Sequence, residues 1–315
     1  MSNWQPSASI QHLHFRAQLM RKIRVFFENR NYLEVETPIL SRFGITDVYI
    51  QQFKTQCLNQ PYYLQTSPEY PMKRLLAAKS GPIFQLARVF RDEELGRWHN
   101  PEFTLLEWYK LHVDHHGLMH EVDEFLQQML ACPSIVKKTY QSVFETQCGI
   151  NPHEVSIPEL KQVLVENHLT GILPEAETDP DQYLFLLMIH VIEPAFSNLP
   201  YPVAVFDFPP SQAALSRIIH GRAARFEVYF QGVELANGFY ELSDPKEQAE
   251  RFERDRQKRL AKGLVSGTVD NYLLEALNHG LPPCSGVALG VDRMIALAAH
   301  ENRLSPILAF SFDRS

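Results

Sequence analysis

The sequence predicts an α+β fold, in which helices flank an antiparallel β-sheet. Strand-like segments occur as hairpins separated by helices, outside the regular strand–helix alternation of a parallel sheet. The 315 residues are 45% hydrophobic and 21% charged, which is enough apolar material for a substantial core. No Gly/Ser-rich linker and no internal repeat divides the chain. We therefore expect one domain over residues 1–315.

The individual elements follow from hydrophobic periodicity and from proline and glycine breaks. Two long strand candidates form a hairpin with an oversized, charged loop, which is uncommon unless the loop has a function. In chain order we expect helices at 10–31, 68–81, 116–130, 245–262, 269–280 and 291–300, strands at 48–54, 61–65, 83–91, 102–112, 202–208, 225–231, 233–242 and 284–290, and a mixed region at 133–200.

Composition excludes several classes of protein. The four cysteines are scattered without a CxxC pair, which indicates neither a zinc site nor a disulfide framework. The N-terminus lacks the layout of a signal peptide, and the longest apolar stretch, 183–192, is about half a membrane span. The net charge of −7 does not suit broad phosphate neutralisation. We expect a cytoplasmic protein that is not membrane-bound. The mixed-charge run 250–263 is either a solvated helix face or a docking patch for a partner.

The hairpin FRDEELGRWHNPEFTLLEWY (90–109) is the first segment with candidate chemistry. Residues two apart on a strand share a face, so Arg91 aligns with Glu93, and Phe103 with Glu107 and Tyr109. Taken alone, the charges form a surface ion pair. The same residue types also suit a nucleotide, because Arg binds phosphate, Glu accepts an exocyclic amine and Phe stacks on a base.

A second segment, RFEVYFQGVELANGFYEL (225–242), spaces three glutamates seven residues apart. If Gln231 and Gly232 turn a hairpin, Glu227 and Glu234 converge on one point. Carboxylates at that density bind a metal or another cation, or are surface glutamates on a hairpin.

The third segment, CSGVALGVDRM (284–294), alternates small and apolar residues. It lacks the Lys-Ser/Thr of a P-loop and the spacing of a dinucleotide fold. Taken alone, the alternation is typical of a strand that packs beneath a helix.

In this order, the segments resemble the signature motifs of class II aminoacyl-tRNA synthetases. Motif 1 corresponds to about 10–40 and includes YLEVETPIL, and motif 2 corresponds to about 83–112. Motif 3 corresponds to about 284–300 and matches GxGxGxDR except at Ala288. Within the class, TSPEYPMKRLL (66–76) and ELANGFYEL (234–242) resemble segments of lysyl-tRNA synthetase.

The resemblance implies ATP and Mg²⁺ as substrate and cofactor. Arg91 would hold the α-phosphate, Phe103 would stack on adenine, and Arg293 would lie near the distal phosphates. The full set of ATP contacts would be Arg91, Asp92, Glu93, His99, Asn100, Phe103, Glu234, Leu235, Gly290 and Arg293. Of these, Arg91, Glu234 and Arg293 would be catalytic, and Glu227 and Glu234 would ligate the metal.

The resemblance also implies an amino-acid pocket. It would consist of Ser67, Pro68, Glu69, Glu107, Tyr109, Asn237, Phe239, Glu241 and Ala288. Such a pocket is rich in carboxylates and suits a substrate with ammonium groups, because carboxylates repel one another when the pocket is empty. The substrate carboxylate would attack the α-phosphorus of ATP, which releases pyrophosphate and forms an acyl-adenylate without a protein nucleophile.

Two departures from the synthetases refine the resemblance. The motif 1 helix begins near residue 10, which leaves no room for an anticodon-binding domain, so stable tRNA binding is not expected. SRFGITDVY (41–49) lacks the double glycine that follows motif 1 in lysyl-tRNA synthetases. Because it also has Ala288 and the sequence motif SPEYxMKRLL, the chain is most similar to the bacterial elongation factor P–(R)-β-lysine ligases, which are paralogues of lysyl-tRNA synthetase. The resemblance implies (R)-β-lysine and ATP as substrates, elongation factor P as acceptor, and a homodimer formed through 10–40.

Two alternatives remain at this point. One is a truncated lysyl-tRNA synthetase-like enzyme that activates lysine for tRNA or another small acceptor. The other is a non-catalytic regulator built on a synthetase fold, against which the intact set of Arg91, Glu93, Glu227, Glu234 and Arg293 argues.

Overall fold

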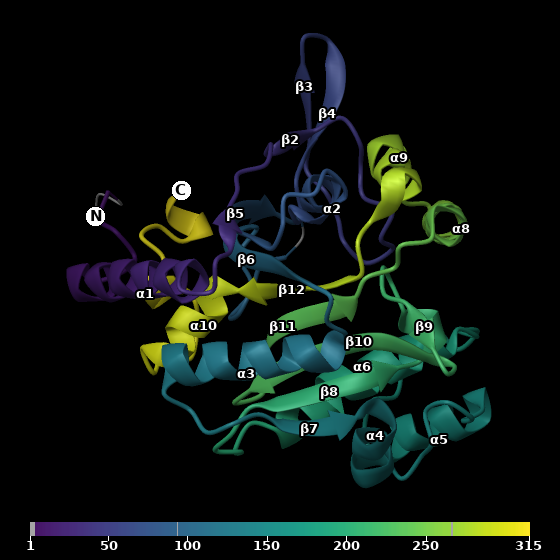
Figure 1. The fold of residues 1–315 in the computed structure, drawn as a ribbon. Coiled ribbons are helices and arrows are strands. Elements are labelled where there is room, and N and C mark those ends of the chain that lie inside the picture. The colour runs from purple at the N-terminus through teal and green to yellow at the C-terminus, as the bar shows by residue number, and fades with distance from the viewer. Residues whose placement is uncertain (1–3, 93, 266) are drawn as a thin grey trace. The chain divides into compact units, whose positions relative to one another are not determined.

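The computed structural model describes residues 4–92, 94–265 and 267–315, so the predicted ATP contact Glu93 lies outside the described residues. The chain divides into two compact units, Met1–Asp114 with Glu241–Ser315, and His115–Tyr240 (Figure 1). Among the described helices, none has both the length and the apolar character needed to cross a membrane.

The first unit contains a sheet with strand order β1-β5-β6-β12. Its strands are β1 (Leu33–Glu34), β5 (Ile83–Phe90), β6 (Glu102–Leu111) and β12 (Cys284–Gly290). β1 is parallel to β5, whereas β6 is antiparallel to both β5 and β12. A smaller antiparallel sheet has the order β2-β4-β3, formed by β2 (Leu40–Ser41), β4 (Gln60–Leu64) and β3 (Lys54–Cys57).

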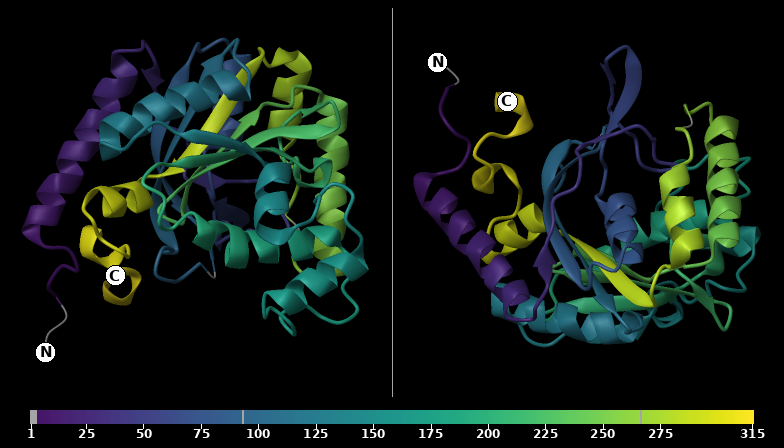
Figure 2. Two further views of the ribbon diagram at one scale, coloured as in Figure 1. Left: turned by 90° about the horizontal axis from the view of Figure 1, so that it is seen from below. Right: turned by 45° about the horizontal axis from the view of Figure 1, so that its top comes forward.

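One face of the larger sheet is covered by α1 (Ile10–Glu28). Phe27, which is fully buried, stacks on Phe84 of β5 at 4.6 Å and meets Trp108 of β6 edge-on at 5.3 Å. The other helices of this unit are α2 (Glu69–Ala77), α8 (Pro245–Ala261), α9 (Asn271–Gly280) and α10 (Val291–Ala298). The N-terminal segment lies beside the C-terminal one, where Ser7 N donates to Ala309 O at 2.8 Å (Figure 2).

A buried ion pair joins elements far apart in the sequence. Arg16 Nη1 of α1 lies 2.6 Å from Asp292 Oδ1 of α10, and Arg16 Nη2 donates to Thr104 Oγ1 of β6 at 3.0 Å. The second oxygen of Asp292 accepts from Thr104 N at 2.9 Å. Both carboxylate oxygens therefore have partners, which offsets the cost of burying the charge. This arrangement ties all three signature motifs to one another.

The second unit contains a sheet with the order β11-β10-β8-β7. Its strands are β7 (Val136–Thr139), β8 (Val203–Phe208), β10 (Arg222–Phe230) and β11 (Val233–Tyr240), and β9 (Ile218–Ile219) pairs with β10. Its helices are α3 (His115–Leu130), α4 (Tyr140–Cys148), α5 (Ile157–Glu166), α6 (Pro180–Leu187) and α7 (Glu193–Ala195), with a π-helical turn at Met188–Ile192. The apolar residues of α4, α5 and α6 form a buried cluster with β8.

The turn between β10 and β11 is the one expected from the sequence. Gln231 and Gly232 both have positive φ, 52° and 72°, as a two-residue hairpin of this type requires.

The fold class and most predicted elements are confirmed, including both hairpins and the strand at 284–290.

The strand expected at 48–54 is wrong, because β3 begins only at Lys54. Asp47 accepts hydrogen bonds from the backbone of Tyr49 and Ile50 at 2.7 and 3.2 Å, which turns the chain. The carbonyl of Ile50 accepts from the guanidinium of Arg259 at 3.0 Å rather than from a neighbouring strand. Local propensity was therefore overridden by a contact from a distant helix.

Candidate active site

The candidate site of the first unit lies on one face of its sheet. Phe103, Leu105, Glu107 and Tyr109 alternate along β6, so their side chains share a face. On β12 they pair with the small residues of motif 3: Gly286 opposite Tyr109, Ala288 opposite Glu107, and Gly290 opposite Leu105. The large and polar side chains of β6 therefore stand beside a strand whose residues on this face are small.

Gly286 is fixed by a close approach. A Cβ atom at this position would lie 2.5 Å from Glu241 Oε1 and would overlap the ring of Tyr109. The backbone N–H of Gly286 also donates to the Glu241 carboxylate, a contact that opposes the rise in the pKa of this group caused by burial. At Gly290 a Cβ would meet only the side chain of Arg293, at an ordinary 3.5 Å. The two glycines are therefore under different constraints.

A buried ion cluster occupies the centre of this face. Lys73 of α2 is 1% exposed, and its Nζ lies 2.7 Å from Glu69 Oε1 and 2.6 Å from Glu241 Oε2. Glu107 is 2% exposed; it accepts from Tyr109 Oη at 2.6 Å and from Ser67 Oγ at 2.7 Å. Five of the nine predicted pocket residues thus meet around Lys73 or Glu107, namely Ser67, Glu69, Glu107, Tyr109 and Glu241. We name Glu69, Lys73, Glu107 and Glu241 the acid cluster.

Burial strongly shifts the pKa values of Glu107 and Glu241. Burial and, next, the nearby charge of Glu69 together raise the pKa of Glu107 to about 8, against the opposing hydrogen bonds of Tyr109 and Ser67. Burial also raises the pKa of Glu241 to about 7, although Lys73 opposes this. Burial works against the charge of Lys73, but Glu241 and Glu69 together raise its pKa. Lys73 therefore stays charged, whereas Glu107 and Glu241 ionise only at a higher pH than an ordinary glutamate.

Lys73 was missed as a site residue from the sequence. The available signal was its position four residues after Glu69 on a predicted helix, the spacing at which two side chains meet on one face. That spacing predicts an exposed i,i+4 pair as readily as a buried one. Its pairing with Glu241, which is distant in sequence, could not be inferred without the fold.

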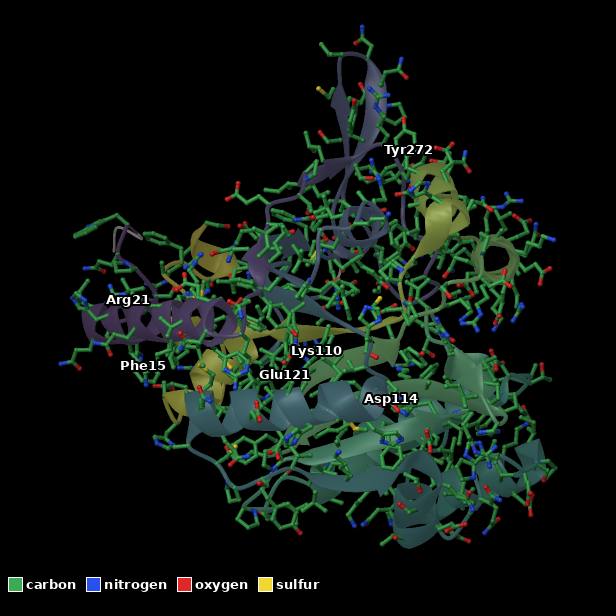
Figure 3. All side chains as sticks on the ribbon, in the orientation of Figure 1. Phe15, Arg21, Lys110, Asp114, Glu121 and Tyr272 are labelled. Carbon is green, nitrogen blue, oxygen red and sulfur yellow. The ribbon has the colours of Figure 1, made fainter. Side chains whose placement is uncertain are left out.

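A cavity borders the acid cluster. It has a volume of about 260 Å³ and is lined by Ser67 and Glu69, together with residues of the 38–45 loop and of the start of α9. Its aromatic rim includes Tyr272, which Figure 3 labels at α9 and which meets Phe43 edge-on at 5.0 Å. The cavity therefore leads from polar carboxylates to an aromatic surface, a composition typical of small-molecule sites.

Arg91 and Phe103 of motif 2 are neighbours. The guanidinium carbon of Arg91 lies 5.2 Å from the centre of the Phe103 ring, and Arg91 Nη1 is 3.6 Å from Glu94 Oε1. Arg293 of motif 3 contacts the motif 2 loop, where its Nε donates to Trp98 O at 3.1 Å and its Nη2 lies 2.7 Å from His99 Nε2. The structure thus brings the predicted phosphate-binding arginines to one hairpin.

Other predicted ATP contacts have different surroundings. Asn100 is buried; its amide nitrogen donates to Glu102 O at 2.6 Å, and its oxygen accepts from Phe312 N at 3.2 Å. Asp92 is exposed and forms a backbone bridge with Gln51. Pro68 is buried at the start of α2. Their roles toward a ligand remain predictions.

The second unit holds the remaining predicted residues on the β10–β11 hairpin. Glu227 is 8% exposed and is contacted by Arg225, by the Tyr229 hydroxyl and, at 3.3 Å, by Asn237 Nδ2. Burial raises the pKa of Glu227, Arg225 opposes this, and the charge of Glu234 raises it further. Phe239 lies on β11, with its ring centre 5.9 Å from the guanidinium carbon of Arg225 on β10. Leu235 has a buried side chain.

This hairpin has the donor atoms that Mg²⁺ requires. Glu227 and Glu234 offer carboxylate oxygens close enough that the charge of Glu234 raises the pKa of Glu227, and hard divalent cations prefer oxygen ligands. Among the described residues, the buried amide oxygen of Asn237 has no hydrogen-bond partner. Arg225 was missed from the sequence, although its spacing of two from Glu227 on a strand places both on one face. The residues fit a magnesium ion, with Arg225 as a competing partner of Glu227.

Comparison with known proteins identifies the family. The sequence model of the family described as tRNA synthetases class II (D, K and N) matches residues 3–314. The chain therefore belongs to this family. It is 48% identical to the elongation factor P–(R)-β-lysine ligase of Hamiltonella defensa subsp. Acyrthosiphon pisum, 50% to that of Vibrio cholerae and 47% to that of Salmonella arizonae. Each alignment covers 100% of this chain and 99% of the relative. The resemblance stated from the motifs is confirmed.

The raised pKa values predict that the ligand-free protein loses stability as pH rises. The pKa of Glu107 is about 8 in the folded protein, so its carboxyl is mostly protonated at neutral pH. In the unfolded chain the same carboxyl ionises near its ordinary pKa. Its contribution is complete below the unfolded pKa and is lost as pH rises through 8. Between pH 6 and 8 we expect the free energy of unfolding to fall less in Glu107→Gln than in the wild type, by about 2 kcal/mol.

The measurement is urea unfolding at several pH values. Glu102→Gln is the matched control, because Glu102 lies on the same strand with its side chain 48% exposed. Equal pH dependence in wild type and Glu107→Gln would contradict an unfavourable buried carboxylate.

Proposed function

We propose that this chain is a cytoplasmic ATP-dependent ligase that adenylates (R)-β-lysine and transfers it to a lysine side chain of elongation factor P. The acid cluster is the observation that supports this most directly. When all three carboxylates are ionised, they exceed the one ammonium group of Lys73 by two charges, and β-lysine supplies two ammonium groups. The names of the full-length relatives support the same substrate and acceptor.

Binding of the amino acid would lower the raised pKa values of Glu107 and Glu241. Burial holds the pKa of Glu107 near 8 and that of Glu241 near 7, so an empty pocket is partly protonated at neutral pH. A bound ammonium group favours the ionised form of each carboxylate. The side chain of Lys73 already occupies the space between Glu69 and Glu241, which leaves Glu107 as the carboxylate best placed for a substrate ammonium.

Activation would take place at motif 2. The substrate carboxylate attacks the α-phosphorus of ATP, a new oxygen–phosphorus bond forms, and pyrophosphate leaves. Arg91 would stabilise negative charge on the phosphoryl oxygens, and Phe103 beside it would stack on the adenine. Arg293, fixed to the motif 2 loop, would approach the distal phosphates. When bound, Mg²⁺ held by Glu227 and Glu234 would neutralise phosphate charge.

Transfer would complete the reaction. The ε-amine of the acceptor lysine attacks the carbonyl of the acyl-adenylate, an amide bond forms, and AMP leaves with the bonding electrons. No protein nucleophile is required, so the protein contributes mainly by orientation and charge. Stable binding of tRNA is not part of this proposal.

The test is a pair of assays on the purified full chain. Pyrophosphate exchange is measured with (R)-β-lysine and with L-α-lysine, and transfer is measured by mass spectrometry of elongation factor P and by acid precipitation of tRNA. We expect faster exchange with (R)-β-lysine and a product on the protein alone. Transfer to tRNA with none to elongation factor P would indicate the synthetase-like alternative. No exchange with any isomer would indicate the regulator.

Ala288 is expected to contribute to the choice of isomer. Its methyl lies opposite Glu107 in the strand register, beside the proposed ammonium position, and packs against the buried cluster of Ala87, Val89 and Leu105. A single methyl group changes selectivity by about 1–3 kcal/mol. We expect Ala288→Gly to raise kcat/KM for α-lysine relative to β-lysine, roughly 10-fold. An unchanged ratio would remove this residue from the explanation, and Ala78→Gly, at an exposed position outside this face, is the control.

Dimerisation through motif 1 is part of the same proposal. Several large apolar side chains of the 10–40 region are exposed in the single chain, including Ile10 at 62% and Leu33 at 54%. Contiguous exposed apolar surface commonly marks a protein interface. We expect a dimer by light scattering, and a monomer of unchanged fold for Leu33→Glu, because Leu33 is exposed. A wild-type monomer at micromolar concentration would contradict this.

A further inference from the structure

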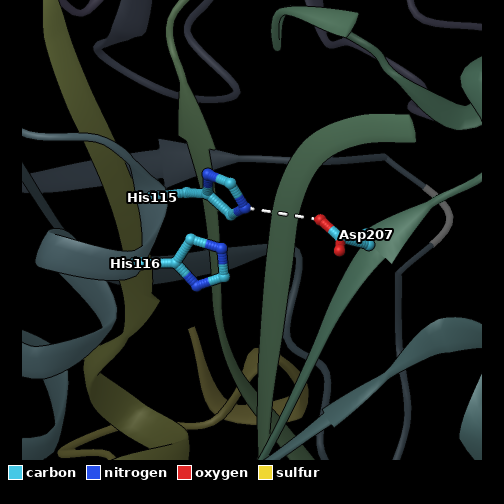
Figure 4. A group of neighbouring side chains, drawn as sticks. All are labelled: His115, His116 and Asp207. Atoms are coloured by element: carbon cyan, nitrogen blue, oxygen red, sulfur yellow. Dashed lines mark ion pairs between the residues drawn. The ribbon is translucent and has the colours of Figure 1, made fainter. Parts of the chain in front are cut away.

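Three side chains with metal-binding groups converge outside the candidate active site. His115 and His116 are the first two residues of α3, and Asp207 lies near the end of β8 (Figure 4). One nitrogen from each ring and one carboxylate oxygen all lie within 4.8 Å of one another. All three residues belong to the second unit, and neither the motifs nor the proposed reaction uses them.

His115 is buried without the contacts that a buried imidazole needs. It is 5% exposed, and among the described residues neither of its ring nitrogens has a hydrogen-bond partner. An unsatisfied buried polar group costs about 1–3 kcal/mol, so each such group in a native protein requires an explanation. Its Nε2 lies 3.5 Å from Asp207 Oδ1, which is too long for a strong hydrogen bond.

The same separation suits two ligands of one ion. Two donor atoms at about 2.0–2.1 Å from a tetrahedral zinc ion are separated by roughly 3.3 Å. An ion placed between His115 and Asp207 would satisfy the buried nitrogen and the carboxylate together. His116 completes the group, with its ring centre 4.2 Å from that of His115.

The backbone at Asp207 is shaped to present its carboxylate. Its φ is +62°, in the left-handed region, although it lies within a strand. The register between β8 and β10 shifts over the same stretch, between Ala223 and Phe226, which indicates a β-bulge. Bulges redirect side chains, and backbone strain of this kind concentrates at functional sites.

We propose that His115, His116 and Asp207 bind one transition-metal ion of the Zn²⁺ class. Two imidazoles and one carboxylate form a ligand set typical of zinc, nickel and copper, whereas Mg²⁺ and Ca²⁺ prefer oxygen alone. The site therefore differs in chemistry from the Glu227 and Glu234 pair. The Asp207 side chain is 34% exposed, so the remaining coordination position opens toward solvent. The bound ion links the start of α3 to Asp207 of β8, opposite the bulge in β10.

A His115–Asp207 ion pair without metal is the competing explanation. That pair engages only Nε2 of His115, at 3.5 Å, and leaves its buried Nδ1 without a hydrogen-bond partner among the described residues. It also gives no role to the neighbouring ring of His116.

The test is direct metal binding to the full chain. Protein stripped with a chelator is titrated with Zn²⁺ by calorimetry and with Co²⁺ by visible absorption, in excess Mg²⁺ to occupy oxygen-only sites. We expect one equivalent per chain and a rise in Tm with Zn²⁺ concentration. His116→Ala and Asp207→Asn are expected to weaken binding at least ~10-fold. Asparagine tolerates the left-handed backbone, so Asp207→Asn preserves the bulge.

His120→Ala is the matched control, because His120 lies on the same helix with its side chain 73% exposed. The affinity of the His120→Ala variant for Zn²⁺ should equal that of the wild type. Absence of stoichiometric binding would overturn the proposal. Equal binding by the wild type, His116→Ala and Asp207→Asn, each with native circular dichroism, would overturn it as well.

Discussion

The desolvated charge of Lys73 is the constraint on which the first unit depends. An ammonium group that is 1% exposed requires partners, and Glu69 and Glu241 provide them from α2 and from the segment that follows β11. Glu107 adds a third carboxylate that Lys73 does not neutralise. Ionising this third carboxylate without a bound cation costs stability in the ligand-free protein, and proteins commonly retain such local instability where a ligand removes it.

The position of Glu241 in turn depends on β12. The backbone N–H of Glu241 donates to Cys284 O at 3.0 Å, and its carboxylate lies against the backbone of Gly286. The strand that supports the acid cluster is continuous with α10, whose Asp292 pairs with Arg16. Of the adjacent Asp292 and Arg293, the first therefore joins the helices to the sheet, while the second contacts the motif 2 loop.

Much of this arrangement could be predicted from the sequence because it depends on local periodicity. The alternation along β6 and β12 and the Gln231–Gly232 turn follow from strand geometry alone. The missed features depend on contacts between distant residues. Arg259 of α8 binds the backbone of residues 47–50, where a strand was expected. Lys73 of α2 pairs with Glu241, which follows β11 and is distant in sequence. The bulge at Asp207 likewise has no pattern in a single sequence, because register is a property of two strands.

The unequal crowding of the motif 3 glycines also bears on how this pocket can change during evolution. Any side chain at Gly286 would collide with Tyr109 and Glu241, so this position tolerates only glycine. Ala288, two residues along the same face, already accommodates a methyl group against the buried cluster of Ala87, Val89 and Leu105. New substrate preferences can therefore arise at one point on this strand without disturbing the charge arrangement two residues away. Divergence of specificity within the family can proceed in single, tolerated steps.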